Sequence, residues 1–158
     1  VMFCLSKGLC APVGSMLVGS REYIEKARAV GKMLGTPMRQ AGVIAAAGIV
    51  ALKENIARLA DDHARAQRLA QILSSIPNIN LDPRSIQTNF VYVNVAPTGL
   101  NAQQVTDGLR SHGLLVARQT DVNIRFAIHK DISEADIERA GEIARCYFAS
   151  LQQESPLP

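Results

Sequence analysis

The sequence contains no tryptophan, and aromatic residues make up only 4% of its 158 residues. It also lacks a block of basic residues, because lysine and arginine alternate with acidic residues and the net charge is only +3. Nucleic-acid-binding proteins combine a clustered cationic face with aromatic side chains that stack on bases. We therefore expect no nucleic-acid partner.

Long apolar runs and paired cysteines are also missing. The longest apolar run, Val43–Leu52, contains Gly48 and is far shorter than the roughly 20 residues that span a bilayer, so we expect no membrane partner. Cys4, Cys10 and Cys146 form no CxxC pair, which disfavours both a zinc site and a disulfide framework. We expect no metal, free buried thiols and a cytoplasmic location.

The N-terminal third of the chain predicts short strands followed by helices. Pro12 and nearby glycines keep the segment 7–14 in a turn, and Ser20 is a suitable N-cap for the first helix. An Ala- and Gly-rich segment follows. The expected elements are strands over 1–6 and 15–18, a helix over 20–34, and a helical segment over 38–52 that continues as a long helix to about residue 75.

After Pro77 the pattern changes to short strands that alternate with helices. Such an order predicts a two-layer α/β unit, with helices on one face of a mainly antiparallel sheet. We place the boundary between two domains near residue 50, which gives domains 1–50 and 51–158. The expected elements are strands over 79–81, 88–95, 114–118 and 123–129, helices over 101–112 and 133–151, and a frayed tail over 152–158.

Lys7 lies between an apolar run and a turn of small residues, with Ser6 before it and Gly8 after it. Partial desolvation disfavours a charged ammonium and leaves a neutral amine that can form a Schiff base with a carbonyl compound. Gly8 removes side-chain bulk, so a flat ligand could approach the backbone. A surface lysine at the end of a strand is the alternative that this local composition leaves open.

A long motif surrounds this lysine. Residues 5–42 read LSKGLCAPVGSMLVGSREYIEKARAVGKMLGTPMRQAG, and the segments DDH at 61–63, TNFV at 88–91 and IRFAIHKD at 124–131 follow in order. These segments resemble the low-specificity threonine aldolases, and the resemblance covers almost the whole chain. It implies an α/β fold of the pyridoxal-phosphate-dependent fold type I class, with 1–50 as the end of the large domain and 51–158 as the small domain.

The resemblance implies that Lys7 forms the Schiff base with pyridoxal 5'-phosphate. The reaction would cleave the Cα–Cβ bond of L-threonine or L-allo-threonine and yield glycine and acetaldehyde. Family members carry much of the active site in an N-terminal half that has no counterpart here. We therefore expect this chain to be the C-terminal half of a homo-oligomer, a dimer or tetramer, whose partner is a small amino-acid substrate.

Arg125 is the candidate substrate-binding residue. It alternates along its expected strand with Ile124 and Phe126, so its side chain points to the face opposite these apolar residues. A guanidinium in such a strand suits a bidentate anion, and the matching arginine of the resembling family binds the substrate carboxylate. An internal salt bridge with a carboxylate side chain is the alternative.

Lys32 and Arg39 are further candidates for binding the cofactor, on the resemblance alone. Both could present positive charge to the cofactor phosphate. The residues Gly35-Thr36-Pro37 stand between them where the family has three glycines. Since proline lacks an amide donor, we expect this loop to offer a phosphate fewer backbone contacts than three glycines would. For Lys32 an ordinary surface charge is an equal alternative.

Two other functions fit these patterns. The first is a different pyridoxal-phosphate-dependent reaction on the same scaffold, such as β-elimination or transamination, because a fold does not determine a reaction. The second is an inactive α/β fragment that only dimerises.

Overall fold

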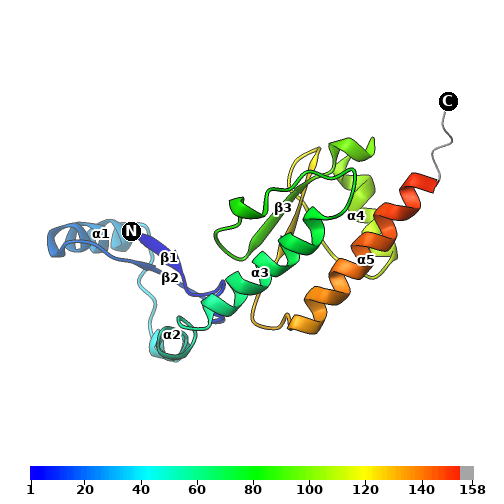
Figure 1. Cartoon of the computed structure of the whole chain (residues 1–158). Coiled ribbons are helices and arrows are strands. Elements are labelled where there is room, and N and C mark those ends of the chain that lie inside the picture. The colour runs from blue at the N-terminus through cyan, green and yellow to red at the C-terminus, as the bar shows by residue number, and fades with distance from the viewer. Residues whose placement is uncertain (154–158) are drawn as a thin grey trace. The chain divides into compact units, whose positions relative to one another are not determined.

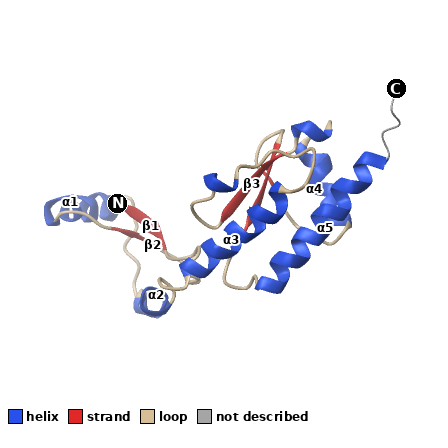
Figure 2. Cartoon of the chain, viewed as in Figure 1, coloured by secondary structure: helices blue, strands red, loops and turns tan. Residues whose placement is uncertain are grey.

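The first residues fold into an antiparallel pair of strands in the computed structural model, which describes residues 1–153. Strand β1 (Met2–Cys4) pairs with β2 (Ser15–Leu17), and Phe3 lies opposite Met16. The two strands are adjacent in Figure 2. The loop between them is closed at its base by a 2.9 Å hydrogen bond from the Leu5 amide to the Gly14 carbonyl oxygen.

Helix α1 (Arg21–Met33) begins and ends where the sequence predicts. The Ser20 hydroxyl accepts a 3.3 Å hydrogen bond from the Tyr23 amide, which satisfies one of the free amides of the first turn. At the other end Gly35 has a φ of 76°, the left-handed conformation that commonly terminates helices.

The expected helix up to residue 75 is interrupted. Helix α2 (Gly42–Glu54) ends at Asn55, and α3 (Leu59–Ser74) begins after a short turn. Ala51 of α2 is buried with three residues near the start of the chain: Leu5, Leu9 and Ala11.

The packing of α2 also determines where the chain divides into two units. The structure separates into an N-terminal unit, Val1–Leu59, and a C-terminal unit, Ala60–Pro158. The sequence places the boundary near residue 50. The whole of α2 therefore groups with the β1–β2 pair.

The C-terminal unit contains a three-stranded antiparallel sheet in the order β3-β5-β4. Its strands are β3 (Phe90–Asn94), β4 (Ala117–Arg118) and β5 (Asn123–Ala127). The expected strand at 79–81 is reduced to a single bridge between Asn80 and Asn94. The strand expected at 114–118 is shorter than predicted, since only its last two residues pair with β5.

Three helices pack against one face of this sheet, as the sequence predicts: α3, α4 (Ala102–Ser111) and α5 (Glu134–Gln153). Val91, Val93, Ile124 and Phe126 point into the core that these helices share with the sheet. Burying each such side chain stabilises the fold by roughly 1.5–3 kcal/mol. Two short 3₁₀ turns, Pro83–Ser85 and Ala96–Thr98, flank β3.

The last helix is capped as expected. The Ser133 amide donates a 2.8 Å hydrogen bond to the Asp136 carboxylate, and the Asp136 amide donates a 3.2 Å hydrogen bond to the Ser133 hydroxyl. Part of the frayed tail expected at 152–158 belongs to α5 as far as Gln153, and the rest lies outside the described residues. Within residues 1–153, no helix has the length and hydropathy needed to cross a bilayer.

Candidate functional site

Lys7 lies on the loop between β1 and β2. Its carbonyl oxygen accepts a 2.8 Å hydrogen bond from the Cys10 amide, and the Ala11 amide donates a 3.0 Å hydrogen bond to the Leu5 carbonyl oxygen. Cys10 has a left-handed φ of 60°. These bonds fold the loop back on itself, so that Leu5 and Leu9 point inward and are buried.

The Lys7 side chain is exposed, and its amine forms no hydrogen bond or ion pair with any residue between 1 and 153. The expected partial desolvation is therefore wrong for this chain by itself. The reason is geometric: the apolar neighbours of Lys7 in sequence turn toward Ala51, while Lys7 stands on the outer side of the loop.

Two side chains from the turn after α2 hold this loop. The Asn55 amide nitrogen Nδ2 donates a 2.8 Å hydrogen bond to the Leu9 carbonyl oxygen, and Arg58 Nη1 donates a 3.4 Å hydrogen bond to the Gly8 carbonyl oxygen. A Cβ atom at Gly8 would lie 2.9 Å from Leu59 Cδ2. A larger residue at position 8 would therefore require the Leu59 side chain or the loop to move.

Lys32 and Arg39 also belong to the N-terminal unit. Lys32 lies in the last turn of α1, and Arg39 lies between α1 and α2, before Gln40 with its left-handed φ of 53°. Both side chains are exposed. In the described part of the chain no hydrogen bond or ion pair joins either of them to Lys7.

Arg125 belongs to the C-terminal unit, in the middle of the central strand β5. Tyr92 of β3 and Ala117 of β4 are its cross-strand partners. The neighbours Ile124 and Phe126 are buried in the core, so Arg125 lies on the opposite face, as the strand pattern predicts. The guanidinium carbon is 4.8 Å from the centre of the Phe90 ring.

The Arg125 guanidinium lacks an acidic partner within residues 1–153, and its Nε atom is buried without a hydrogen-bond partner. The internal salt bridge that the sequence left as an alternative is absent from this part of the chain. A buried donor without an acceptor costs free energy. The arrangement therefore favours an anion that accepts hydrogen bonds from this guanidinium.

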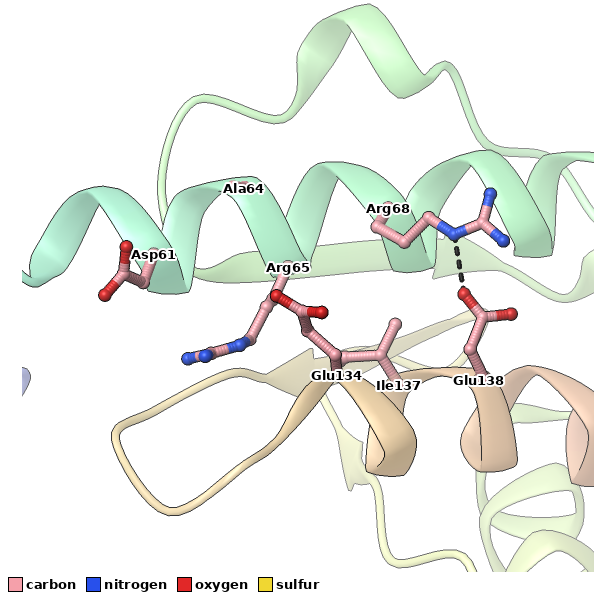
Figure 3. Close-up of a pocket in the computed structure, with 7 residues that line it drawn as sticks. All are labelled: Asp61, Ala64, Arg65, Arg68, Glu134, Ile137 and Glu138. Atoms are coloured by element: carbon pink, nitrogen blue, oxygen red, sulfur yellow. Dashed lines mark hydrogen bonds and ion pairs between the residues drawn. The ribbon is translucent and has the colours of Figure 1, made fainter.

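A cavity of about 320 Å³ lies between α3 and α5 (Figure 3). Arg68 Nε donates a 2.6 Å hydrogen bond to Glu138 across this cavity. This bond, together with the positive charge, lowers the pKa of the Glu138 carboxyl. Because Arg68 and Glu138 satisfy each other, they have a structural explanation that needs no ligand. The lining residues are Asp61, Ala64, Arg65, Arg68, Glu134, Ile137 and Glu138.

The cysteines differ in part from the expectation. All three are free, but Cys10 and Cys146 are exposed and Cys4 is only partly buried, so the expected burial of the thiols is wrong. Cys146 is on an outer face of α5. Residues 1–153 contain no cluster of three or more side chains suited to a metal ion.

Sequence reasoning missed Asn55, Arg58 and Phe90. Asn55 carries a weak signal, since it is a polar residue that follows Ala51 by one helical turn on the buried side of α2. Phe90 carries none, because its contact with Arg125 depends on the register between β3 and β5.

Solved structures define the fold class. The chain superimposes on an 8-amino-7-oxononanoate synthase from Francisella tularensis with a TM-score of 0.66 and 20% identity, over 97% of this chain and 45% of that one. A NifS-like protein from Rickettsia africae gives a TM-score of 0.56 and 16% identity, over 85% of this chain and 39% of that one. The fold is that of the pyridoxal-phosphate-dependent fold type I class, as the sequence predicts.

Sequence comparisons define the family. Residues 1–96 match the family model described as β-eliminating lyase. A low-specificity L-threonine aldolase of Arabidopsis thaliana is 41% identical over 138 residues, which are 87% of this chain and 38% of that protein. The low specificity L-threonine aldolase of Escherichia coli K12 is 39% identical over 148 residues, 94% of this chain and 41% of that protein. The chain belongs to the β-eliminating lyase family, and it spans about two fifths of the length of these relatives.

Proposed function

We propose that this chain forms the C-terminal part of an aldolase that depends on pyridoxal 5'-phosphate. The enzyme cleaves the Cα–Cβ bond of L-threonine or L-allo-threonine and releases glycine and acetaldehyde. The observation that carries this proposal is the Lys7 amine, which has no partner within residues 1–153 and stands on a loop held by Asn55 and Arg58. The names of the relatives supply the substrate class.

The residues present fit the cofactor in their chemistry. When bound, pyridoxal phosphate supplies an electron sink for the pair left at Cα as the Cα–Cβ bond breaks. Lys7 provides the amine that holds the cofactor aldehyde, and Gly8 leaves room beside it because it has no side chain. Lys32 and Arg39 provide exposed positive charge for the phosphate.

Arg125 binds the α-carboxylate of the substrate in this proposal. A guanidinium presents parallel N–H donors that match the two oxygens of a carboxylate. The absence of an acidic side chain beside Arg125 within residues 1–153 supports an external partner, and so does its unpaired buried Nε. Holding the carboxylate fixes which bond at Cα is aligned for cleavage.

Helix α2 supports the proposal that further polypeptide covers the N-terminal unit. Its sequence is apolar up to Lys53, yet within the described chain it buries only Gly48 and Ala51. A helix that is apolar on all sides normally lies in a protein interior. An apolar groove of about 290 Å³ runs along it, lined by side chains that include Leu5, Met16, Ile44, Ile49 and Leu52.

The curated relatives are about two and a half times as long as the segment matched here, since that segment is 38–41% of their length. The remaining length is the natural cover for α2 and the source of the groups that bury Lys7. We also propose that the complete protein is a homodimer or homotetramer, and that its three free cysteines reflect a cytoplasmic location.

Covalent labelling tests the role of Lys7. The full-length protein is incubated with pyridoxal phosphate, reduced with borohydride and digested, and the modified peptides are mapped. We expect label at Lys7 and its loss in Lys7→Ala, with Lys53→Ala as the matched control that keeps the label. Equal labelling of many lysines would overturn the proposal and favour the inactive dimerisation fragment.

Product analysis separates the proposed aldolase from other reactions on the same fold. With L-threonine or L-allo-threonine we expect glycine and acetaldehyde in equal amounts. Ammonia and a keto acid would indicate β-elimination. A keto acid formed together with a new amino acid would indicate transamination.

A further inference from the structure

The guanidinium of Arg125 lies over an aromatic ring. Its central carbon is 4.8 Å from the centre of the Phe90 ring, within the roughly 6 Å over which a cation is attracted to a ring face. Phe90 and Arg125 come from neighbouring strands and point to the same face of the sheet, away from the helices. This contact is the only ring contact of Arg125 among residues 1–153.

The register of the strands allows this contact. Tyr92 is directly opposite Arg125, and Phe90 is opposite Ala127, so Phe90 and Arg125 form a diagonal pair within reach of long side chains. The residues beside Arg125 are small. Ala127, next to Arg125 on this face of β5, lies opposite Phe90, and Ala117 of β4 lies opposite Arg125. The Arg125 chain can therefore bend across the sheet onto the Phe90 ring.

The backbone beside Phe90 is fixed. The Asn89 side-chain Nδ2 donates a 2.7 Å hydrogen bond to the Ile128 carbonyl oxygen, and the Ile128 amide donates a 2.9 Å hydrogen bond to the Asn89 carbonyl oxygen. These two bonds lock the start of β3 to the end of β5. The ring of Phe90 is thus held by the sheet and does not depend on a flexible loop.

Stacking restricts the guanidinium in a specific way. An arginine has several rotatable bonds and loses rotamer entropy when it binds a ligand. With its central carbon over the ring and Nε buried, the guanidinium is already restricted before a ligand arrives. A group held in the binding geometry costs less to order on binding.

We propose that Phe90 is a positioning residue that holds the Arg125 guanidinium flat for a substrate carboxylate. This inference rests on the proposed role of Arg125. Phe90 acts through Arg125 and through the electrons of its ring, so its contribution depends on aromaticity as well as on size. It is independent of the cofactor aldehyde and of Lys7.

The test compares ligands with and without a carboxylate in the full-length protein loaded with pyridoxal phosphate. Dissociation constants for glycine and for methylamine are measured by spectral titration, and their ratio isolates the carboxylate contribution. We expect Phe90→Leu to weaken glycine about three- to thirtyfold, the range of a cation–π contact, and to leave methylamine unchanged. Phe90→Tyr should keep wild-type affinity, because the ring face remains.

Two further variants make the outcome specific. Tyr92→Leu removes an aromatic ring from the same strand and face. That ring contacts the Phe90 ring, with 6.1 Å between their centres, but does not stack on Arg125, so the variant should change the glycine-to-methylamine ratio less than Phe90→Leu does. In an Arg125→Ala background, Phe90→Leu should have no additional effect on that ratio, as expected for coupled residues. Fluorinated phenylalanine at position 90 should weaken glycine in step with fluorine content while the size of the ring hardly changes.

The possible failures are distinguishable. If Arg125→Ala leaves the ratio unchanged, the proposed carboxylate role of Arg125 fails, and this inference fails with it. If Arg125→Ala raises the glycine-to-methylamine ratio of dissociation constants but Phe90→Leu and the fluorinated variants do not, only the positioning role of Phe90 is overturned. If Phe90→Leu does not fold, the Phe90→Tyr and fluorinated proteins decide.

Discussion

The side chain of Asn55 is joined to the backbone of Leu9 by a 2.8 Å hydrogen bond that links residues 46 positions apart in the sequence. Leu9 is two residues after Lys7, so this bond ties the end of α2 to the loop that carries the candidate cofactor lysine. The bond lies in a partly buried environment.

Replacing Asn55 with leucine should destabilise the N-terminal unit. The change removes the donor and leaves a partly buried carbonyl oxygen unpaired, which costs about 1–3 kcal/mol. Denaturant unfolding of the full-length protein measures this loss, and borohydride labelling of Lys7 should fall as the loop loosens. Gln103→Leu, which removes an amide from the exposed surface of α4, is the control and should change stability by less than about 0.5 kcal/mol. Equal effects of the two variants would contradict the role of Asn55.

Arg125→Ala should weaken binding of the amino acid far more than binding of the cofactor. Hydrogen bonds to charged groups contribute about 1.5–3 kcal/mol, so glycine affinity should fall roughly ten- to a hundredfold. Arg125→Lys should give an intermediate loss, because an ammonium keeps the charge but lacks the planar pair of donors. Titrations with glycine and with pyridoxal phosphate measure the two affinities. An equal loss of both would remove the carboxylate role.

Ser133→Ala should destabilise α5 in a pH-dependent manner. Loss of an N-cap costs about 1 kcal/mol. Hydrogen bonds from the Ser133 side chain and backbone hold the pKa of the Asp136 carboxyl below its ordinary value of 3.8. A depressed pKa adds stability above the ordinary value, and that stability is lost as the pH falls through the lower pKa of the folded state.

The destabilisation by Ser133→Ala should therefore be largest near neutral pH and shrink in acid. Thermal unfolding at several pH values measures it, and Ser74→Ala on the exposed surface of α3 is the control. The hydrogen bond from the Asp136 amide to the Ser133 hydroxyl does not depend on pH, so a part of the difference should remain in acid. A difference between the two variants that is undiminished below the pKa of folded Asp136 would show that the carboxylate does not take part.

Gly141→Ala should destabilise the contact between α3 and α5. An added Cβ would lie 2.5 Å from Ile72 Cγ2, an atom of a buried side chain. Overpacking costs about 1–3 kcal/mol, and the better helix propensity of alanine returns about 1 kcal/mol, so we expect a net loss of roughly 1 kcal/mol. Gly42→Ala is the control, since nothing lies within 4 Å of its added Cβ. The added cost of Gly141→Ala should disappear in an Ile72→Ala background.

Local signals in the sequence predicted much of the fold. Ser20 and Ser133 cap helices where the sequence places them, because a cap depends on a few neighbouring residues. The alternation of Ile124, Arg125 and Phe126 predicted the exposed face of β5, because side chains of a strand alternate between faces. The short strands at 79–81 and 114–118 were overestimated, because pairing partners decide whether an extended segment becomes a strand.

Less of the candidate site than of the fold could be predicted from the sequence. Its candidate residues came from a motif, but their surroundings depend on contacts between distant segments. The hydrogen bond of Asn55 to Leu9 and the stacking of Phe90 on Arg125 both require the tertiary structure. The expected desolvation of Lys7 failed because a local apolar composition does not tell which side of a loop a side chain takes.

Because α2 is apolar on all sides but largely unburied, we expect the N-terminal unit to unfold locally more easily than the C-terminal unit. The C-terminal unit has a continuous core of its own, whereas the N-terminal unit buries only Leu5, Leu9, Ala11 and Ala51 in its hydrophobic cluster. Backbone amides of β3 and β5 should thus exchange with deuterated water slowly, and those of α2 quickly, in the chain as it stands. If further polypeptide covers α2, as we propose, its association would act as a folding step for the lysine-bearing loop.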